Sequence, residues 1–82
     1  MNLKEKVLKA IKEHPFSTLF VVSCVLEGKT VTFIDGDGEK RLKGEEALKE
    51  HFRGIYRCSN GFDVSEEELE KAYKIFKKIV FH

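Results

Sequence analysis

The longest apolar segment of the chain, LFVVSCVL at residues 19–26, is the feature that most constrains the fold. It is too short to cross a bilayer, which takes about 20 apolar residues in a helix. It lies within STLFVVSCVLE (17–27), which is rich in β-branched and aromatic residues and predicts a strand. After Gly28, KTVTFID (29–35) alternates in polarity and predicts a second strand, joined to the first by a two-residue turn.

In such a hairpin, alternate side chains would point to opposite faces of the sheet. One face would be strongly apolar and would form the core with the helices. The other would mix apolar and small polar side chains, and on it we expect an interface formed by Val21, Ser23, Val25, Thr30, Thr32 and Ile34. Exposed contiguous apolar patches mark interaction sites, so we expect a homo-oligomer or another protein partner there. The alternative is a monomer with a helix on each face.

The acidic run FIDGDGEKRLKGEE (33–46) is similar in spacing to a calcium-binding EF-hand loop. Ligand positions 1, 3, 5 and 12 would be Asp35, Asp37, Glu39 and Glu46. However, the sixth position is Lys40 instead of glycine, and a predicted strand, not a helix, precedes the run. We therefore expect a turn built from Asp and Gly, followed by a short charged edge strand at 39–43.

Three further segments carry apolar residues at helical spacing. The first predicts a helix over roughly residues 2–13. The second predicts a helix after Gly44 that ends before Gly54, which is well placed as a C′ residue. The third begins at Ser65, which can form a capping box with Glu68. Its buried stripe would comprise Leu69, Ala72, Tyr73, Phe76, Ile79 and Val80.

Together these segments predict an α+β fold in the order αβββα(β)α. The antiparallel sheet would have three strands, or four if residues 55–58 join it instead of forming a packed loop, with helices on one face. Eighty-two residues leave room for one domain, spanning 1–82. The chain is 41% hydrophobic and 35% charged, which is typical of a globular domain.

The bulk composition also limits the function classes. Fifteen basic and fourteen acidic residues nearly cancel, which argues against strong nonspecific binding to nucleic acid or to an anionic membrane. Lysines interrupt the apolar residues of the N-terminal segment, so we expect no signal peptide, a cytoplasmic location and no membrane partner. Gln is absent and Asn occurs only at positions 2 and 60, a bias typical of thermophilic proteins.

Catalytic and metal-binding residues are not evident. Cys24 and Cys58 lack CxxC spacing and the three histidines form no close pair, so we expect no metal and no cofactor. Whether the two cysteines form a disulfide stays open. Cys58 with His51 is the best nucleophile and base candidate, but no third residue that could orient the base is evident. We therefore expect no enzymatic activity.

Nucleic-acid binding is the alternative to protein binding. The predicted helix–three strands–helix order is similar to that of double-stranded RNA-binding domains, but Glu45 and Glu46 occupy the helix start where those domains carry basic residues. Phosphate contacts would come from the basic residues before that helix or from the lysine row of the last helix: Lys40, Arg41, Lys43, Lys71, Lys74 and Lys78. The sequence thus predicts a small non-enzymatic interaction module that self-associates through the semi-apolar face of its sheet.

Overall fold

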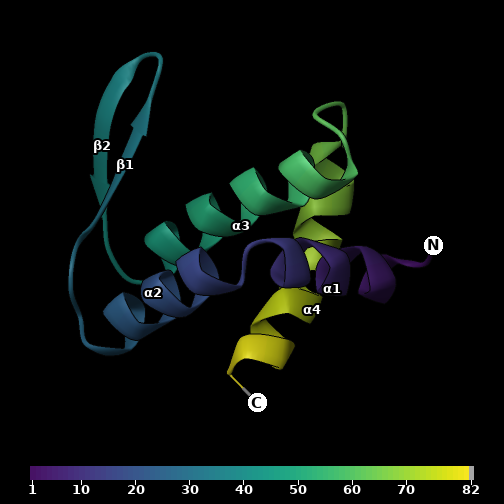
Figure 1. Cartoon of the computed structure of the whole chain (residues 1–82), viewed down its shortest axis with the longest axis horizontal. Helices are drawn as coiled ribbons and strands as arrows, with labels where there is room; N and C mark the ends of the chain where they lie inside the picture. The colour runs from purple at the N-terminus through teal and green to yellow at the C-terminus, as the bar shows by residue number, and fades with distance from the viewer. Residues whose placement is uncertain (82) are drawn as a thin grey trace.

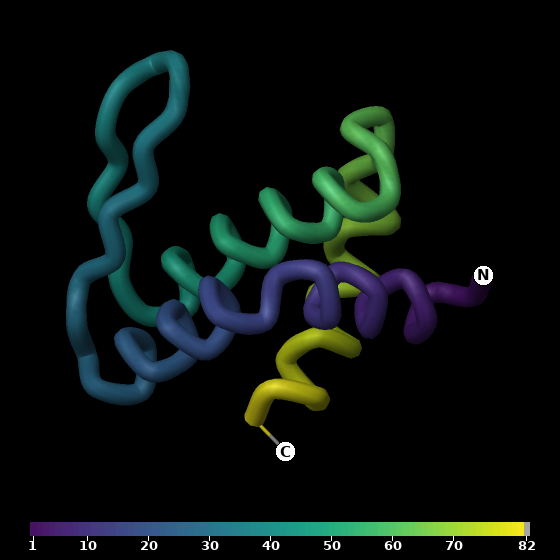
Figure 2. The backbone as a smooth tube through the Cα atoms, in the orientation of Figure 1, coloured from purple at the N-terminus to yellow at the C-terminus, as the bar shows by residue number. Residues whose placement is uncertain are grey.

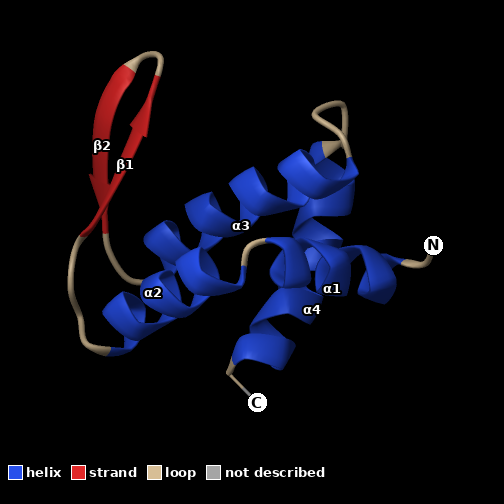
Figure 3. Ribbon diagram, viewed as in Figure 1, coloured by secondary structure: helices blue, strands red, loops and turns tan. Residues whose placement is uncertain are grey.

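The computed structural model describes residues 1–81 and shows a helical body from which a single β-hairpin projects (Figures 1 and 3). The elements are α1 (Leu3–Glu13), α2 (Pro15–Leu26), β1 (Val31–Asp35), β2 (Gly38–Leu42), α3 (Glu45–Asn60) and α4 (Glu66–Val80). The protein is therefore α+β, with four helices and a two-stranded antiparallel sheet in the part of the chain described. The predicted sheet of three or four strands and the order αβββα(β)α are wrong. On one face of the sheet, Val31 is buried and Phe33 and Leu42 pack against the helical core.

The main cause of this error is the segment predicted as the first strand, which forms helix α2. Pro15 stands in the first turn of α2, where its fixed φ suits a helix and its missing N–H would have had no helical partner. Strand propensity is strongly context-dependent, and tertiary packing overrides it here.

The end of α2 is a Schellman motif at Gly28, not a hairpin turn. Gly28 has φ 72°, the left-handed region that glycine adopts without a steric penalty. Its N–H donates to the carbonyl of Val25 at 3.2 Å, and the N–H of Lys29 donates to the carbonyl of Cys24 at 2.8 Å. These two bonds satisfy carbonyls that the helix end would otherwise leave unpaired.

The strands predicted at 29–35 and 39–43 form as β1 and β2 and, as predicted, pair with each other across the Asp/Gly turn. Their antiparallel register runs from Val31 opposite Leu42 to Asp35 opposite Gly38. The Asp/Gly run makes the turn between them, as predicted: the N–H of Asp37 donates to Asp35 Oδ1 at 2.8 Å. Between residues 1 and 81, no group of three or more His, Cys, Asp or Glu side chains is arranged to hold a metal ion.

Helix α3 continues past the predicted end at Gly54 and includes 55–58, which form neither a strand nor a loop. Ile55 and Tyr56 extend its buried face, being 6% and 0% exposed. A glycine inside a helix costs only about 1 kcal/mol relative to alanine, which burial of those two side chains exceeds. The helix ends at Gly61, whose φ is 122°.

The core lies between α1, α3 and α4 and centres on four aromatic side chains of the last two helices. The ring of Phe52 is completely buried, with its centroid 5.3 Å from Tyr56, 5.8 Å from Tyr73 and 4.7 Å from Phe76. The predicted stripe of α4 is confirmed, because its Leu, Ala, Tyr and Phe positions are buried and Ile79 and Val80 pack against them.

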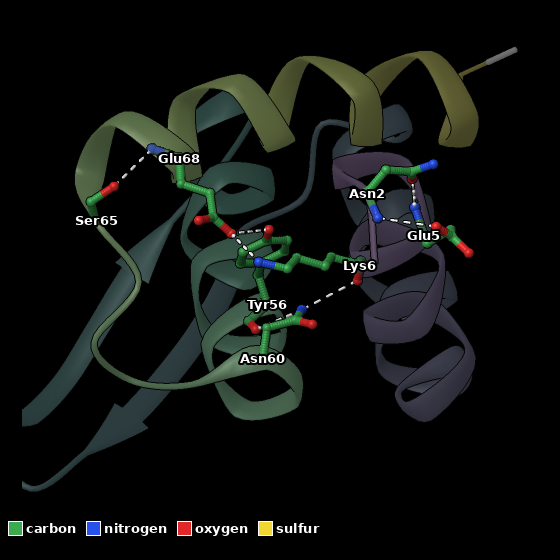
Figure 4. A network of polar contacts seen from close by, with 7 residues as sticks. All are labelled: Asn2, Glu5, Lys6, Tyr56, Asn60, Ser65 and Glu68. Carbon is green, nitrogen blue, oxygen red and sulfur yellow. Dashed lines mark hydrogen bonds and ion pairs between the residues drawn. The ribbon is translucent and has the colours of Figure 1, made fainter.

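A polar network ties the same three helices together (Figure 4). Ser65 caps α4 by accepting from the N–H of Glu68, as predicted. The Glu68 carboxylate does not complete the capping box; instead it accepts from the Tyr56 hydroxyl and from Lys6 Nζ, the latter at 3.3 Å. These donors hold the pKa of Glu68 below its ordinary value, with the tyrosine hydrogen bond contributing most. Asn60 adds a bond to the backbone carbonyl of Lys6 at 3.2 Å.

Helix α2 and the hairpin lie at one side of this body (Figure 2). Helix α2 packs against α3, while the hairpin extends away from the helices and is joined to the body at its base. Val31 is the one buried side chain of the hairpin, at 4% exposure. The molecule therefore presents two features with little covering: the outer side of α2 and the hairpin.

Candidate interaction surface

Helix α2 is predominantly apolar and contains no charged residue. Its inner side is buried in the body through Thr18, Val21 and Cys24. Its outer side carries four large hydrophobic side chains in solvent. Their exposed fractions are 84% for Phe16, 65% for Leu19, 60% for Phe20 and 69% for Leu26.

We define the α2 face as these four side chains together with the exposed Ser23 that lies among them: Phe16, Leu19, Phe20, Ser23 and Leu26. The positions follow the i, i+3, i+4, i+7 rule, so they form one continuous stripe along the helix. From the exposed fractions, we estimate that the stripe leaves on the order of 500 Å² of apolar side-chain area in water. Monomeric proteins rarely expose contiguous apolar patches above a few hundred Å², and such patches usually serve a function.

A buried hydrogen bond fixes α2 on the body. Thr18 Oγ1 and His51 Nε2 lie 2.9 Å apart, and both side chains are buried. Burial, together with the nearby charge of His14, lowers the pKa of His51 to about 4, so the ring is neutral at pH 7. His51 is therefore a packing residue that positions α2 on α3.

The residues predicted to form an interface are not brought together on one face. Val21 is buried and Val25 half-buried in α2, while Ser23 is exposed on its outer side. The other three lie before or on β1 and are exposed: Thr30, Thr32 and Ile34. These residues would share a sheet face only if residues 17–27 formed a strand, and most of that segment belongs to helix α2.

The α2 face could have been found from a different signal in the sequence. A proline at residue 15 and a glycine at residue 28 bracket a segment of helical length, and this proline–glycine order is typical of helix starts and ends. On a helix, the large residues at 16, 19, 20 and 26 fall on one side. The β-branched and aromatic residues of the same segment favoured a strand and concealed this pattern.

The predicted basic residues lie on β2, just after it and on α4, and half of them form ion pairs. Lys40 Nζ lies 3.6 Å from Glu50, Arg41 Nε 2.9 Å from Glu39, and Lys71 Nζ 3.2 Å from Glu67. The other three form no ion pair within residues 1–81: Lys43, Lys74 and Lys78. Carboxylates therefore lie beside half of the side chains that were predicted to contact phosphates.

A cavity of about 360 Å³ lies between the hairpin, α2 and α3. His51 and Cys58, the candidate base and nucleophile, both line it, together with His14, Ser17 and Ile34. The His51 ring forms its hydrogen bond with Thr18, not with the thiol. Cys58 is exposed and free, and Cys24 is free and buried, so the two cysteines do not form a disulfide.

Two further observations bear on function. Across residues 1–81, no helix is both long enough and apolar enough to cross a membrane. Comparison with known protein families, with curated proteins and with solved structures finds no match to this chain. The geometry of the chain itself is therefore the basis for a functional proposal.

Proposed function

We propose that this chain is a cytoplasmic, non-enzymatic interaction module that binds a protein surface through the α2 face. The observation that carries the proposal is the uncharged helix α2, which buries one side and leaves four large apolar side chains in water. At about 25 cal/mol per Å², covering on the order of 500 Å² would gain roughly 10 kcal/mol before the entropic cost of association.

The way α2 is held also supports binding. The Thr18–His51 hydrogen bond and the glycine cap at Gly28 fix the helix before any partner arrives. Ordering the binding element in advance reduces the entropy lost on association. An apolar stripe on a rigid helix is a recurring recognition element for an apolar groove or a second helix.

Nucleic-acid binding is less well supported as the alternative function. Binding of phosphates depends on several basic side chains that act on one surface. Here Lys40, Arg41 and Lys71 are close to carboxylates that would compete with phosphate. An exposed apolar helix has no role in contacts to a phosphate backbone.

Site-specific photo-crosslinking in extracts of cells that make the protein tests the proposed function. A benzophenone amino acid would replace Phe20 on the α2 face or, as a control, Lys74, which is exposed on α4. We expect a protein adduct of defined mass from position 20 and not from position 74. The adduct should disappear when Leu19→Glu is added, because a carboxylate would then have to be buried in the contact. If position 20 gives no protein adduct, the proposed function is wrong.

A further inference from the structure

We infer that the partner of the α2 face is a second copy of this chain, with the two α2 helices packed antiparallel about a two-fold axis near residue 21. This inference rests on the proposed function and specifies its partner. Three properties of α2 support it: the spacing of its exposed side chains, the placement of charge at its ends, and its exposed area.

The exposed side chains have the spacing of a helix–helix seam. Phe16, Leu19, Ser23 and Leu26 follow one another at intervals of three, four and three residues, as the a and d positions of a helix pair do. Phe20 lies beside this seam and widens it.

The α2 faces of two copies are complementary when the helices pack antiparallel. In an antiparallel pair centred near residue 21, Phe16 of each copy lies level with Leu26 of the other. Leu19 lies level with Ser23, whose small side chain leaves room for it. Phe20 lies close to the axis, next to its equivalent. Near the middle of the helices, each Leu19 therefore meets a small side chain, and the two Phe20 rings pack against each other.

Charge favours the antiparallel direction over the parallel one. Helix α2 has no acidic side chain in its first turn and no basic side chain in its last turn, so nothing in either turn offsets its dipole. Glu27 follows the last residue of the helix. Antiparallel pairing brings Glu27 of each copy towards the positive N-terminal end of the other α2, whereas parallel pairing would bring the two Glu27 side chains together.

The exposed area is sufficient for a dimer. Two α2 faces would bury on the order of 1,000 Å² in total, which reaches the lower range of specific interfaces. No charged side chain between residues 15 and 26 would be desolvated. We therefore expect a dimer with a dissociation constant in the micromolar range, on the order of 1–100 μM.

Sedimentation velocity of the purified full chain over a concentration series tests the dimer. We expect the mass to rise from that of one 9.5 kDa chain to twice that value. Leu19→Glu should weaken association at least 100-fold while leaving the far-ultraviolet circular dichroism unchanged, because the Leu19 side chain is 65% exposed and lies outside the buried core. Lys74→Glu is the matched control and should leave the dissociation constant unchanged. A chain that stays monomeric up to millimolar concentration would overturn the inference.

Disulfide trapping tests the geometry in a Cys58→Ser background, which removes the exposed native thiol. Phe20→Cys should crosslink two copies on mild oxidation because it lies near the axis. Phe16→Cys should not, because antiparallel packing separates its two copies by about ten helical residues, or roughly 15 Å. Efficient trapping through position 16 would show parallel packing and overturn the proposed geometry.

The two proposals can fail separately. If the purified chain is monomeric but position 20 forms an adduct with a different protein, the dimer is wrong and the interaction module stands. If position 20 forms no adduct at all, both are wrong. An adduct of twice the chain mass, lost with Leu19→Glu, supports both.

Discussion

At the scale of single residues, His51 links the buried side of α2 to the helical body. A histidine is rarely buried without a hydrogen-bond partner, because its polar nitrogens would otherwise lose water without compensation. Here Thr18 supplies the partner at 2.9 Å. Burial first, and the charge of His14 second, lower the pKa of His51 from its ordinary value of 6.5 to about 4.

This lowered pKa makes the stability of the protein dependent on pH. Between pH 6.5 and 4 the unfolded chain binds a proton at His51 and the folded chain does not, so the free energy of unfolding falls as the pH falls. Above pH 6.5 His51 is neutral in both states and does not change the free energy of unfolding. Below pH 4 it is protonated in both states, and the loss of stability is complete. After allowance for residual solvent screening, we expect a loss of about 2 kcal/mol, measured by urea unfolding at each pH.

His51→Gln is the control for that measurement. The longer glutamine amide reaches the position of His51 Nε2, where the hydrogen bond to Thr18 forms, but it does not titrate, so the variant should lose less stability over the same pH range. Acidic residues contribute to the pH dependence of both proteins, and the difference between the two profiles isolates His51. Parallel profiles for the two proteins would contradict the expected role.

At the scale of elements, the backbone conformation of a glycine decides where α2 and α3 end. Gly28 and Gly61 have positive φ and each stands at a helix C-terminus. Gly54 has the dihedral angles of its helix and lies on the exposed side of α3. In the sequence, each of the three glycines is a plausible helix end. Helix α3 continues past Gly54 because the residues that follow it, Ile55 and Tyr56, are buried.

Gly54→Ala should therefore stabilise the protein. No atom lies within 4 Å of the position that an added Cβ would occupy, and alanine favours a helix over glycine by about 1 kcal/mol. We expect the free energy of unfolding to rise by about 0.5–1 kcal/mol in chemical denaturation.

Gly61→Ala is the matched comparison and should have the opposite effect. Its φ of 122° strains any other residue, and the added Cβ would lie 2.8 Å from Asp63 Oδ1. We expect a loss of stability of about 1–2 kcal/mol in the same denaturation experiment. If both alanine variants shifted stability in the same direction, helix continuity through Gly54 would be in doubt.

At the scale of the whole molecule, the nearly balanced charge and the dispersed basic residues determine how the protein behaves towards polyanions. Ion pairs engage Lys40 and Arg41 on the hairpin and Lys71 on α4. Surface ion pairs contribute little to stability, but they place a carboxylate where a phosphate would have to bind.

We therefore expect no binding of generic duplex DNA or RNA below 10 μM, even at low salt where phosphate attraction is strongest. Fluorescence anisotropy of a labelled duplex, titrated at low and at physiological ionic strength, measures this. Binding that weakens steeply with salt and is lost on replacing Lys43, Lys74 and Lys78 by Gln would favour the nucleic-acid alternative over protein binding.

The sequence by itself determined the elements whose signals are local. The helix over 2–13, the two strands of the present hairpin, the Asp/Gly turn and the Ser65 cap each depend on residues close together in the chain. Periodicity and capping are short-range effects, so they can be recognised without knowledge of the fold.

Only the tertiary structure decided the state of residues 15–26, the length of α3 and hence the candidate site. An apolar run without charges suits a buried strand or a helix equally well, and the choice depends on what it packs against. Thr18, Val21 and Cys24 pack as one side of a helix against a body assembled from distant residues. That packing leaves Phe16, Leu19 and Phe20 outside, and the candidate site follows from this long-range choice.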